Sequence, residues 1–316
     1  MPLNLLEATN AAEGSKAEIL TAELMGEDPI FNRIHWINEP TTQYMYSQVV
    51  SLGDAGTRAL NDQREGSFSR QAQYTENRRI FSDQMLIDRQ IIAGDPARRA
   101  KEEFRKIESI REAWLRMFFK GSSAIDPTQF DGLQVRSTRA SLAGRPSRKL
   151  MNNSVSGAPL SLGMLRRAID NTSANAILMP EQILQYLSEA GEIGTLKGAV
   201  LYNKDEFGMT MAYYGGLPII PIRRDSADNY LLDTTELSAD GARNDCTSIY
   251  IVGFGEGKLQ GINFQGVDGR YGIDVKDQGE QGPFMRTFID WPCSIVDEHQ
   301  RCFTRLRGIV PGGITA

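Results

Sequence analysis

The residues best suited to chemistry lie near the C-terminal end of the chain. Asp297, Glu298, His299 and Cys302 are close in sequence and offer the oxygen, nitrogen and sulfur atoms that bind metal ions. Their spacing matches no standard zinc arrangement, and a single histidine is few for such a site. We therefore interpret this segment as a polar turn between two strands, with a metal site as the alternative.

The histidines and cysteines narrow the chemistry further. His35 and His299 are the only two histidines, and any Ser-His-Asp triad or Cys-His dyad would have to use one of them. Neither lies in a recognisable catalytic setting. The three cysteines are odd in number and form no Cys-x-x-Cys pair, which favours free thiols in a reducing compartment. The sequence therefore predicts no catalytic residue, no metal ligand set and no cofactor.

A glycine-rich segment at residues 253–258 follows an expected strand and raises the question of a phosphate-binding loop. Its glycine spacing differs from that of a P-loop, and Leu259 stands where serine or threonine should follow the lysine. No helical pattern follows that would present its N-terminus to a phosphate. A hairpin turn is the better interpretation.

Composition excludes further classes. The chain has 316 residues, 41% of them hydrophobic and 24% charged, and a formal net charge of −5. These values are ordinary for a globular protein with two compact lobes, or one large domain with extensions. The acidic balance argues against a general nucleic-acid binder. We find no apolar run long enough to span a bilayer and no signal-peptide pattern, so no membrane role is expected.

The strongest structural signal is one long helix. Asp95 and Pro96 are suited to its first turn, the run continues from residue 97 to 120, and Gly121 follows as a stop. Such a helix is about 37 Å long at about 1.5 Å per residue. Apolar residues recur every three or four positions and predict one buried stripe, made of Ala100, Phe104, Ile107, Ile110, Trp114 and Met117.

Two unusual segments precede this helix. Residues 1–39 have the pattern of an arm, with a short helix at 16–25 and an apolar patch that must pack on something, formed by Ile30, Phe31, Ile34 and Trp36. Residues 40–78 contain two extended stretches around a polar, glycine-bearing connection: 41–51, with Tyr44, Tyr46, Gln48 and Val50 on one face, and 69–75. A disordered surface loop is one interpretation. The more specific interpretation is a hairpin that projects from the body of the subunit and lies on a neighbouring subunit, because long loops inside compact domains are uncommon.

The segments around and after the helix complete the pattern. Residues 78–92 predict one long strand that leads into the helix. Residues 134–149 are basic and contain no acidic residue, which indicates either a solvated loop or a contact with an acidic partner or polyanion. From residue 159 the pattern is α/β, with two amphipathic helices around a buried strand at 176–179. A strand-rich half follows, with strands expected at 209–214, 217–222, 248–254, 259–264, 271–275, 285–295 and 301–309.

In this order, the chain resembles the major capsid proteins of tailed bacteriophages, which have the Hong Kong 97-type fold. The resemblance covers nearly the whole length. It rests on the arm, the extended loop, the helix, and three short motifs: the Phe118-Phe119-Lys120-Gly121 and Phe130-Asp131-Gly132-Leu133 pair, the segment 174–179, and Tyr214-Gly215-Gly216-Leu217-Pro218-Ile219. Each motif alone is weak, whereas their order is more specific.

The resemblance implies an α+β fold with five segments. These are an N-terminal arm (1–39), an extended hairpin loop (40–78), a peripheral domain (79–150) with a spine helix at 96–120, an α/β axial domain (151–282), and C-terminal strands that complete both domains (283–316). It implies a non-enzymatic protein that assembles through hexamers and pentamers into an icosahedral shell around double-stranded DNA. Assembly would take place in the host bacterial cytoplasm and end in the virion, with separate scaffolding, portal or decoration proteins as further partners.

The resemblance also suggests which residues act. Expected intersubunit contacts are Tyr44, Tyr46, Asp54, Arg58, Arg64, Glu65, Phe31 and Trp36. An expected polyanion contact comprises Arg136, Arg139, Arg145, Arg148 and Lys149. Residues 40–78 contain no lysine, so the lysine–asparagine crosslink of some family members is not expected. Two alternatives stay open: an encapsulin-type compartment shell, and an α/β enzyme with an unrecognised site.

Overall fold

The computed structural model describes residues 28–63, 66–94, 97–142, 148–192, 200–204, 210–266 and 271–315. The helices are α3 (Pro29–Arg33), α4 (Arg89–Gly94), α5 (Ala97–Lys120), α6 (Leu133–Leu142), α7 (Leu162–Asp170) and α8 (Glu181–Glu192). The first strands are β1 (His35–Glu39), β2 (Gln43–Ser51), β3 (Arg70–Asn77), β4 (Arg79–Asp88), β5 (Lys149–Met151), β6 (Ala158–Ser161), β7 (Ala176–Pro180) and β8 (Val200–Lys204). The remaining strands are β9 (Thr210–Tyr214), β10 (Leu217–Ile222), β11 (Thr247–Val252), β12 (Leu259–Phe264), β13 (Asp274–Gln281), β14 (Phe284–Asp297) and β15 (Phe303–Thr315).

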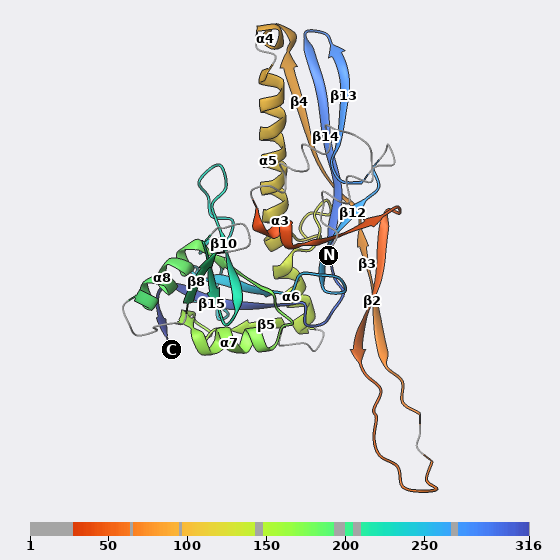
Figure 1. The fold of residues 1–316 in the computed structure, drawn as a ribbon, viewed down its shortest axis with the longest axis vertical. Coiled ribbons are helices and arrows are strands. Elements are labelled where there is room, and N and C mark those ends of the chain that lie inside the picture. The colour runs from red at the N-terminus through yellow and green to blue at the C-terminus, as the bar shows by residue number, and fades with distance from the viewer. Residues whose placement is uncertain are drawn as a thin grey trace.

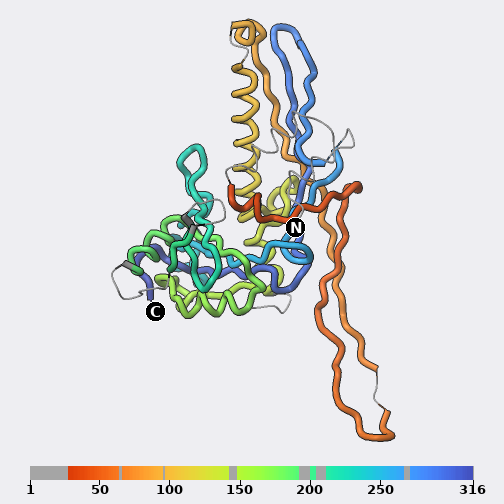
Figure 2. Tube along the Cα trace, viewed as in Figure 1, coloured from red at the N-terminus to blue at the C-terminus, as the bar shows by residue number. Residues whose placement is uncertain are grey.

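The molecule has three parts that point in different directions (Figure 1). A tall unit contains α5 alongside β4, β13 and β14. An α/β unit with α7 and α8 lies to one side of its base. A long hairpin of β2 and β3 starts beside the base of the tall unit, on the side away from α7 and α8, and extends in the opposite direction from α5. The tube in Figure 2 shows how far the connection between β2 and β3 projects from the rest of the chain.

Helix α5 spans Ala97–Lys120 as predicted, while the expected cap residues 95 and 96 lie outside the described residues. The predicted apolar stripe is wrong at the N-terminal end, where Ala100 and Phe104 are exposed and Glu103 is buried. The reason is the surface that α5 meets. Arg99 Nε lies 3.2 Å from Glu103 Oε1, and Arg99 Nη2 donates to Thr287 Oγ1 of β14 at 3.1 Å. The sheet offers polar partners to this end of the helix.

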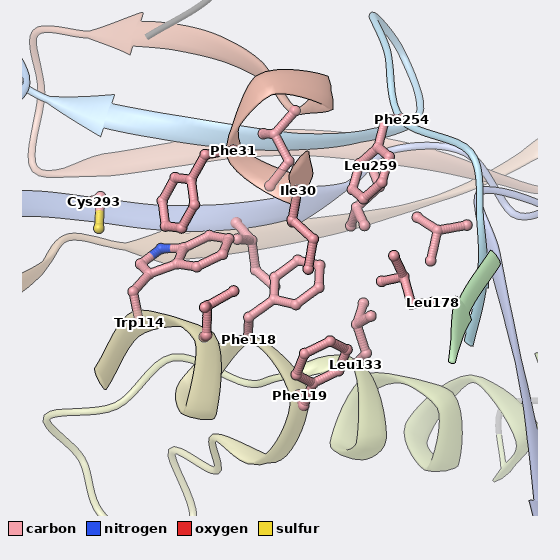
Figure 3. Packing of buried hydrophobic residues seen from close by; sticks show 14 of the residues in the cluster. Ile30, Phe31, Trp114, Phe118, Phe119, Leu133, Leu178, Phe254, Leu259 and Cys293 are labelled. Carbon is pink, nitrogen blue, oxygen red and sulfur yellow. The ribbon is translucent and has the colours of Figure 1, made fainter. Parts of the chain in front are cut away.

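The other end of α5 enters an aromatic core (Figure 3). Trp114 lies 4.6 Å from Phe31 of α3 between ring centroids, and 4.9 Å from Phe118. Trp36 of β1 lies 5.5 Å from Trp291 of β14. Buried aromatic side chains remove large apolar areas from water, and tilted rings add specific contacts. This core therefore ties the segment 29–39 to the helix and to the sheet.

One five-stranded sheet forms the tall unit. Its order is β1-β12-β14-β13, and β4 also pairs with β14. Strands β13 and β14 form an antiparallel hairpin, and β14 pairs with β4 from Phe284 opposite Asp88 to Cys293 opposite Arg79. The predicted axial segment 151–282 thus contributes two strands, β12 and β13, to the sheet that contains β4.

An eight-stranded sheet forms the α/β unit, in the order β5-β15-β11-β7-β10-β9-β8 with β6 on β15. Its central strands are buried on both faces, as the apolar run at 176–179 predicted. Ile177 and Ile251 face a cluster that includes residues of α7 and α8, whereas Leu178 and Val252 face the cluster of α5. The sheet is therefore the middle layer between two cores.

The hairpin of β2 and β3 is antiparallel, with Tyr46 opposite Tyr74 and Tyr44 opposite Glu76. This arrangement confirms the two extended stretches expected within residues 40–78. The expected strand at 78–92 is shorter than predicted, since β4 ends at Asp88 and α4 follows. The Asp88 side chain accepts the N–H of Gln90, a local contact that favours the change to helix. The helix expected at 16–25 lies outside the described residues.

Two glycines let the chain return past the end of α5. The amide of Gly132 donates to the carbonyl of Gly121 at 2.9 Å. A Cβ added at Gly132 would stand 2.5 Å from the carbonyl oxygen of Met117, and one added at Gly121 would stand 2.4 Å from that of Phe130. This backbone contact explains the paired motifs at 118–121 and 130–133. None of the described helices combines the length and apolar character needed to cross a membrane.

Candidate functional site: the extended hairpin and its buried joint

The far part of the hairpin presents apolar side chains to solvent. Leu52, Leu60 and Phe68 are 81%, 96% and 88% exposed. Exposed apolar side chains gathered on one projecting element mark an interaction surface more often than scattered ones do. The hairpin therefore carries a surface that its own subunit leaves uncovered among the described residues.

The near part of the hairpin meets the body at a buried polar cluster, which we call the joint. It consists of Tyr46, Gln48 and Glu76 from the hairpin, Arg136 from α6, Arg148, and Asp297 at the end of β14. Arg136 is 1% exposed and Asp297 4% exposed. The joint thus brings together residues from distant parts of the sequence in the interior of the subunit.

Arg136 is the centre of the joint. Its Nη1 lies 2.6 Å from Asp297 Oδ1, and its Nη2 lies 2.9 Å from Glu76 Oε1. Its Nη2 also donates to the carbonyl of Ile295 at 3.0 Å, and its Nε to the carbonyl of Asp131 at 2.6 Å. The planar guanidinium has several donors in fixed directions, which suits it to link three segments at once.

The remaining members complete the contacts of Asp297. Tyr46 donates its hydroxyl to Asp297 Oδ1 at 3.1 Å, and Gln48 donates to the Asp297 carbonyl. Arg148 Nη2 lies 3.0 Å from Asp297 Oδ2, and the Arg148 guanidinium covers the ring of Phe303 at 4.3 Å. A cavity of about 20 Å³, lined in part by Gln48, Arg136, Arg148 and Asp297, has room for about one water molecule. The joint is therefore closely packed.

The charges in the joint respond differently to burial. Burial opposes the charge on Asp297, but Arg136 and Arg148 outweigh it and hold the pKa of this carboxyl below its ordinary value. Burial raises the pKa of Glu76, and the attraction of Arg136 offsets this only in part. Burial also raises the pKa of the Tyr46 hydroxyl, with Asp297 adding to the effect. Asp297 is therefore the firmly ionised partner of Arg136.

A second anchor lies beside the joint. Tyr44 donates its hydroxyl to Glu298 Oε1 at 2.6 Å, and Gln260 of β12 donates to Glu298 Oε2 at 3.1 Å. Tyr44, Tyr46 and Tyr74 form a row of stacked rings across the hairpin, with centroids 6.3 Å and 5.6 Å apart. The predicted face of β2 that bears Tyr44, Tyr46 and Gln48 is thus the face that docks on the body.

The structure places the expected intersubunit contacts in different settings, and half-buried Tyr44 belongs to the second anchor within the subunit. Asp54 and Arg58 are exposed in the connection of the hairpin, while Arg64 and Glu65 lie outside the described residues. Phe31, Trp36 and Tyr46 are buried within the subunit, so an intersubunit role is wrong for these three. The apolar patch at 30–36 packs on α5 and β14 of its own chain because those elements present Trp114 and Trp291 to it.

The expected polyanion contact also changes. Arg136 and Arg148 are buried and paired with carboxylates, so they are not a surface for a polyanion, and that prediction is wrong for both. Residues 133–142 form helix α6 instead of a loop. Arg145 lies outside the described residues. Arg139 is partly exposed near Asp131, and Lys149 is half-buried, so a polyanion contact at these two stays a prediction.

The segments considered for metal and nucleotide binding have structural roles. Residues 298–302 link β14 to β15, as the polar-turn interpretation predicted, and Asp297 is engaged by two arginines. Among the described residues no group of three His, Cys, Asp or Glu side chains is placed to hold a metal ion. The glycine-rich segment 253–258 is a turn, but not the predicted hairpin, because β11 and β12 belong to different sheets.

Comparisons with known proteins find a similar fold at low sequence identity. No family model matches the chain, and no curated protein matches it. A structure of the holo-SrpI encapsulin complex from Synechococcus elongatus matches with a TM-score of 0.62 and 16% identity, over 91% of this chain and 89% of that one. A structure of Mycobacterium phage Bobi matches with a TM-score of 0.55 and 11% identity, over 99% and 100%. The capsid of an empty GTA particle matches with a TM-score of 0.55 and 9% identity, over 88% of each chain.

These likenesses cover most of the chain. They show that the chain has the Hong Kong 97-like fold, which phage capsids, the GTA capsid and encapsulin share. The expectation of an α+β fold of this type is confirmed. At these identities the likeness concerns the fold, and function is a separate question.

Proposed function

We propose that this chain is a major capsid protein that self-assembles into the icosahedral shell of a tailed bacteriophage. The observation that carries the proposal is the hairpin, which is anchored at its base and exposes Leu52, Leu60 and Phe68 far from the body. An apolar surface on a projection that is anchored at its base is suited to lie on another copy of the same chain. The fold it shares with a GTA capsid and phage structures supports this partner.

In this proposal the work of the protein is assembly, and no bond chemistry is required. Hexamers and pentamers form when each hairpin covers a neighbour, and contacts of modest strength add up over many subunits. Scaffolding, portal and decoration proteins act as separate partners. Assembly takes place in the bacterial cytoplasm, and the mature protein resides in the virion.

The shell encloses double-stranded DNA without reading its sequence. A net charge of −5 is compatible with this role, because a wall can confine a genome without binding it tightly. Among the described residues, Arg139 and Lys149 are the candidates for a contact with the polyanion that remain after Arg136 and Arg148 are assigned to the interior.

A second candidate function is an encapsulin-type compartment, whose shell encloses a cargo protein instead of a genome. The TM-score of 0.62 with the SrpI encapsulin favours it as an alternative. Both candidates share the shell and differ in its contents. An α/β enzyme is the remaining alternative, and the isolated histidines and the structural use of Asp297 count against it.

The test is to express the protein alone and with any neighbouring scaffold gene, and to image the product by negative-stain electron microscopy. Closed, thin-walled particles of uniform shape support the proposal. A monomer or dimer under both conditions would overturn it. Particles purified from the natural source then separate the two shell functions, since a capsid contains double-stranded DNA and a compartment contains a co-purifying cargo protein.

A further inference from the structure

The direction of the hairpin does not follow from strand pairing. In the described part of the chain, β2 and β3 form a sheet of their own, separate from the five-stranded sheet beside them. The backbone hydrogen bonds near its base do not join the hairpin to a strand of the body: Arg78 N donates to the Thr42 carbonyl between the hairpin's own strands, and Gln265 N donates to the Glu39 carbonyl beyond the end of the β1–β12 pairing. A hairpin attached in this way is free to pivot unless side chains hold it.

Side chains supply that restraint, and they meet at the end of β14. Tyr46 and Glu76 are bound by Asp297 and Arg136, and Tyr44 is bound by Glu298. The body supplies both members of the Arg136–Asp297 pair, because α6 and β14 both belong to the body. The hairpin therefore docks on a charged pair that lies within the body.

We propose that Arg136 and Asp297 are positioning residues for assembly, which fix the direction of the hairpin and so the angle at which its tip meets a neighbouring subunit. This inference rests on the proposed shell function. Charged hydrogen bonds restrict direction more strongly than apolar contacts do, because each needs a particular donor geometry. A restricted hairpin favours one curvature, whereas a pivoting hairpin permits several.

The residues on the hairpin side allow a test that leaves the body intact. In the double variant Tyr46→Phe with Glu76→Gln, the shapes of both side chains are kept. The Tyr46 hydroxyl and the Glu76 charge are lost, while Arg136 keeps Asp297. The control is Tyr202→Phe with Glu189→Gln, which makes the same two chemical changes at exposed positions of β8 and α8.

The first readout is the distance between two spin labels in unassembled subunits. The labels are attached to cysteines introduced at Gln71 of the hairpin and Ser109 of α5, both of which are exposed, whereas the native cysteines are buried. We expect a narrow distance distribution in the parent and control proteins, and a distribution at least twofold broader in the joint variant. A distribution of equal width in all three proteins would overturn the inference, and so would a broad one in the parent. If the double variant does not fold, Tyr46→Phe alone is measured in the same way.

The second readout is the diameter distribution of assembled particles. We expect uniform particles from the parent and control, and mixed diameters or open sheets from the joint variant. Uniform particles built from subunits with a broadened hairpin would show that hairpin direction does not set curvature. If the parent forms no particles, the proposed function fails, and the spin-label distances still decide whether the joint holds the hairpin.

Discussion

The guanidinium of Arg136 donates to the carboxylate of Asp297 at 2.6 Å, across 161 positions of sequence. This pair connects α6 to the end of β14, and Glu76 of the hairpin joins it from a third segment. The hairpin, α6 and the end of β14 therefore meet at one buried cluster. Its stability and its geometry can be tested separately.

Removing the central cation should be costly. Arg136→Met leaves Asp297 and Glu76 buried with less compensation, and breaking such a pair costs about 3–5 kcal/mol. The matched control is Arg139→Met on the same helix, where the guanidinium is partly exposed and the pair with Asp131 contributes about 0–1 kcal/mol. Urea unfolding of unassembled subunits measures both changes. Equal losses in the free energy of unfolding of the two variants would contradict this prediction, because they would mean that removing Arg136 leaves no uncompensated buried charge in the joint.

The raised pKa of Glu76 predicts a particular dependence on pH. Because the folded state holds its proton more tightly than the unfolded state, the contribution of Glu76 to stability falls as the pH rises above about 4.5 through the folded pKa. Glu76→Gln removes this pH-dependent contribution to stability. The free energy of unfolding of the parent, relative to that of Glu76→Gln, should therefore be larger near pH 5 than near pH 7. A relative stability that increases with pH would contradict the direction of the shift.

Asp297 should act in the opposite sense at lower pH. Its pKa is depressed, so its stabilising contribution is present above about pH 4 and is lost as the pH falls through the folded value. Acid titration of the parent and of Asp297→Asn, followed by tyrosine and tryptophan fluorescence, measures this contribution. The parent should be more stable than the variant at neutral pH, and the two should converge in acid. A difference that persists unchanged below pH 3 would refute the assignment.

The backbone contact after α5 gives a prediction about packing. Gly132→Ala places a methyl group against the carbonyl of Met117, so we expect a loss of about 1–3 kcal/mol in the free energy of unfolding. Gly191→Ala in α8 is the control, because nothing lies within 4 Å of the added atom. That change should leave stability equal or raise it by up to about 1 kcal/mol. Denaturant unfolding measures the stability of both variants. A greater loss in Gly191→Ala than in Gly132→Ala would contradict the prediction.

The exposed part of the hairpin should matter for assembly and not for folding. Leu52→Asp with Phe68→Asp changes two exposed side chains, so the unfolding temperature of the subunit should stay within about 2 °C, in keeping with the small effect of surface substitutions. Particle yield should fall at least tenfold. Ile125→Asp, at an exposed position outside the hairpin, is the control.

Deleting residues 53–66 should have the same effect as the double substitution, and normal particles from the deletion would exclude the hairpin as an intersubunit clamp.

Local patterns were sufficient to predict much of the fold. The helix at Ala97–Lys120, the buried strand at Ala176–Pro180 and the two strands of the hairpin each have a periodicity that a single element explains. Strand β1 was not predicted, because its residues His35–Glu39 were interpreted as part of an arm. Its pairing is a parallel one with β12, more than two hundred positions away, and no local pattern contains such a partner.

The joint shows why the site was only partly predictable. The face of β2 with Tyr44, Tyr46 and Gln48 was recognisable from alternation, but its partner was not. Arg136 and Arg148 were interpreted as surface charge because residues 134–149 contain no acid. Their carboxylates come from Glu76 and Asp297, which are far away in sequence. A basic segment without local acids is a signal that the partners lie elsewhere, and it does not say whether they lie in the same chain.

A reconstruction of assembled particles by cryo-electron microscopy tests the central claim most directly. The account predicts a closed shell of copies of this chain in which Leu52 and Phe68 of each hairpin are covered by a neighbouring subunit, with Tyr46 and Glu76 still bound to Asp297 and Arg136. A protein that stays monomeric at every concentration and with every scaffold tested would contradict it, as would particles in which the hairpins project freely into solvent.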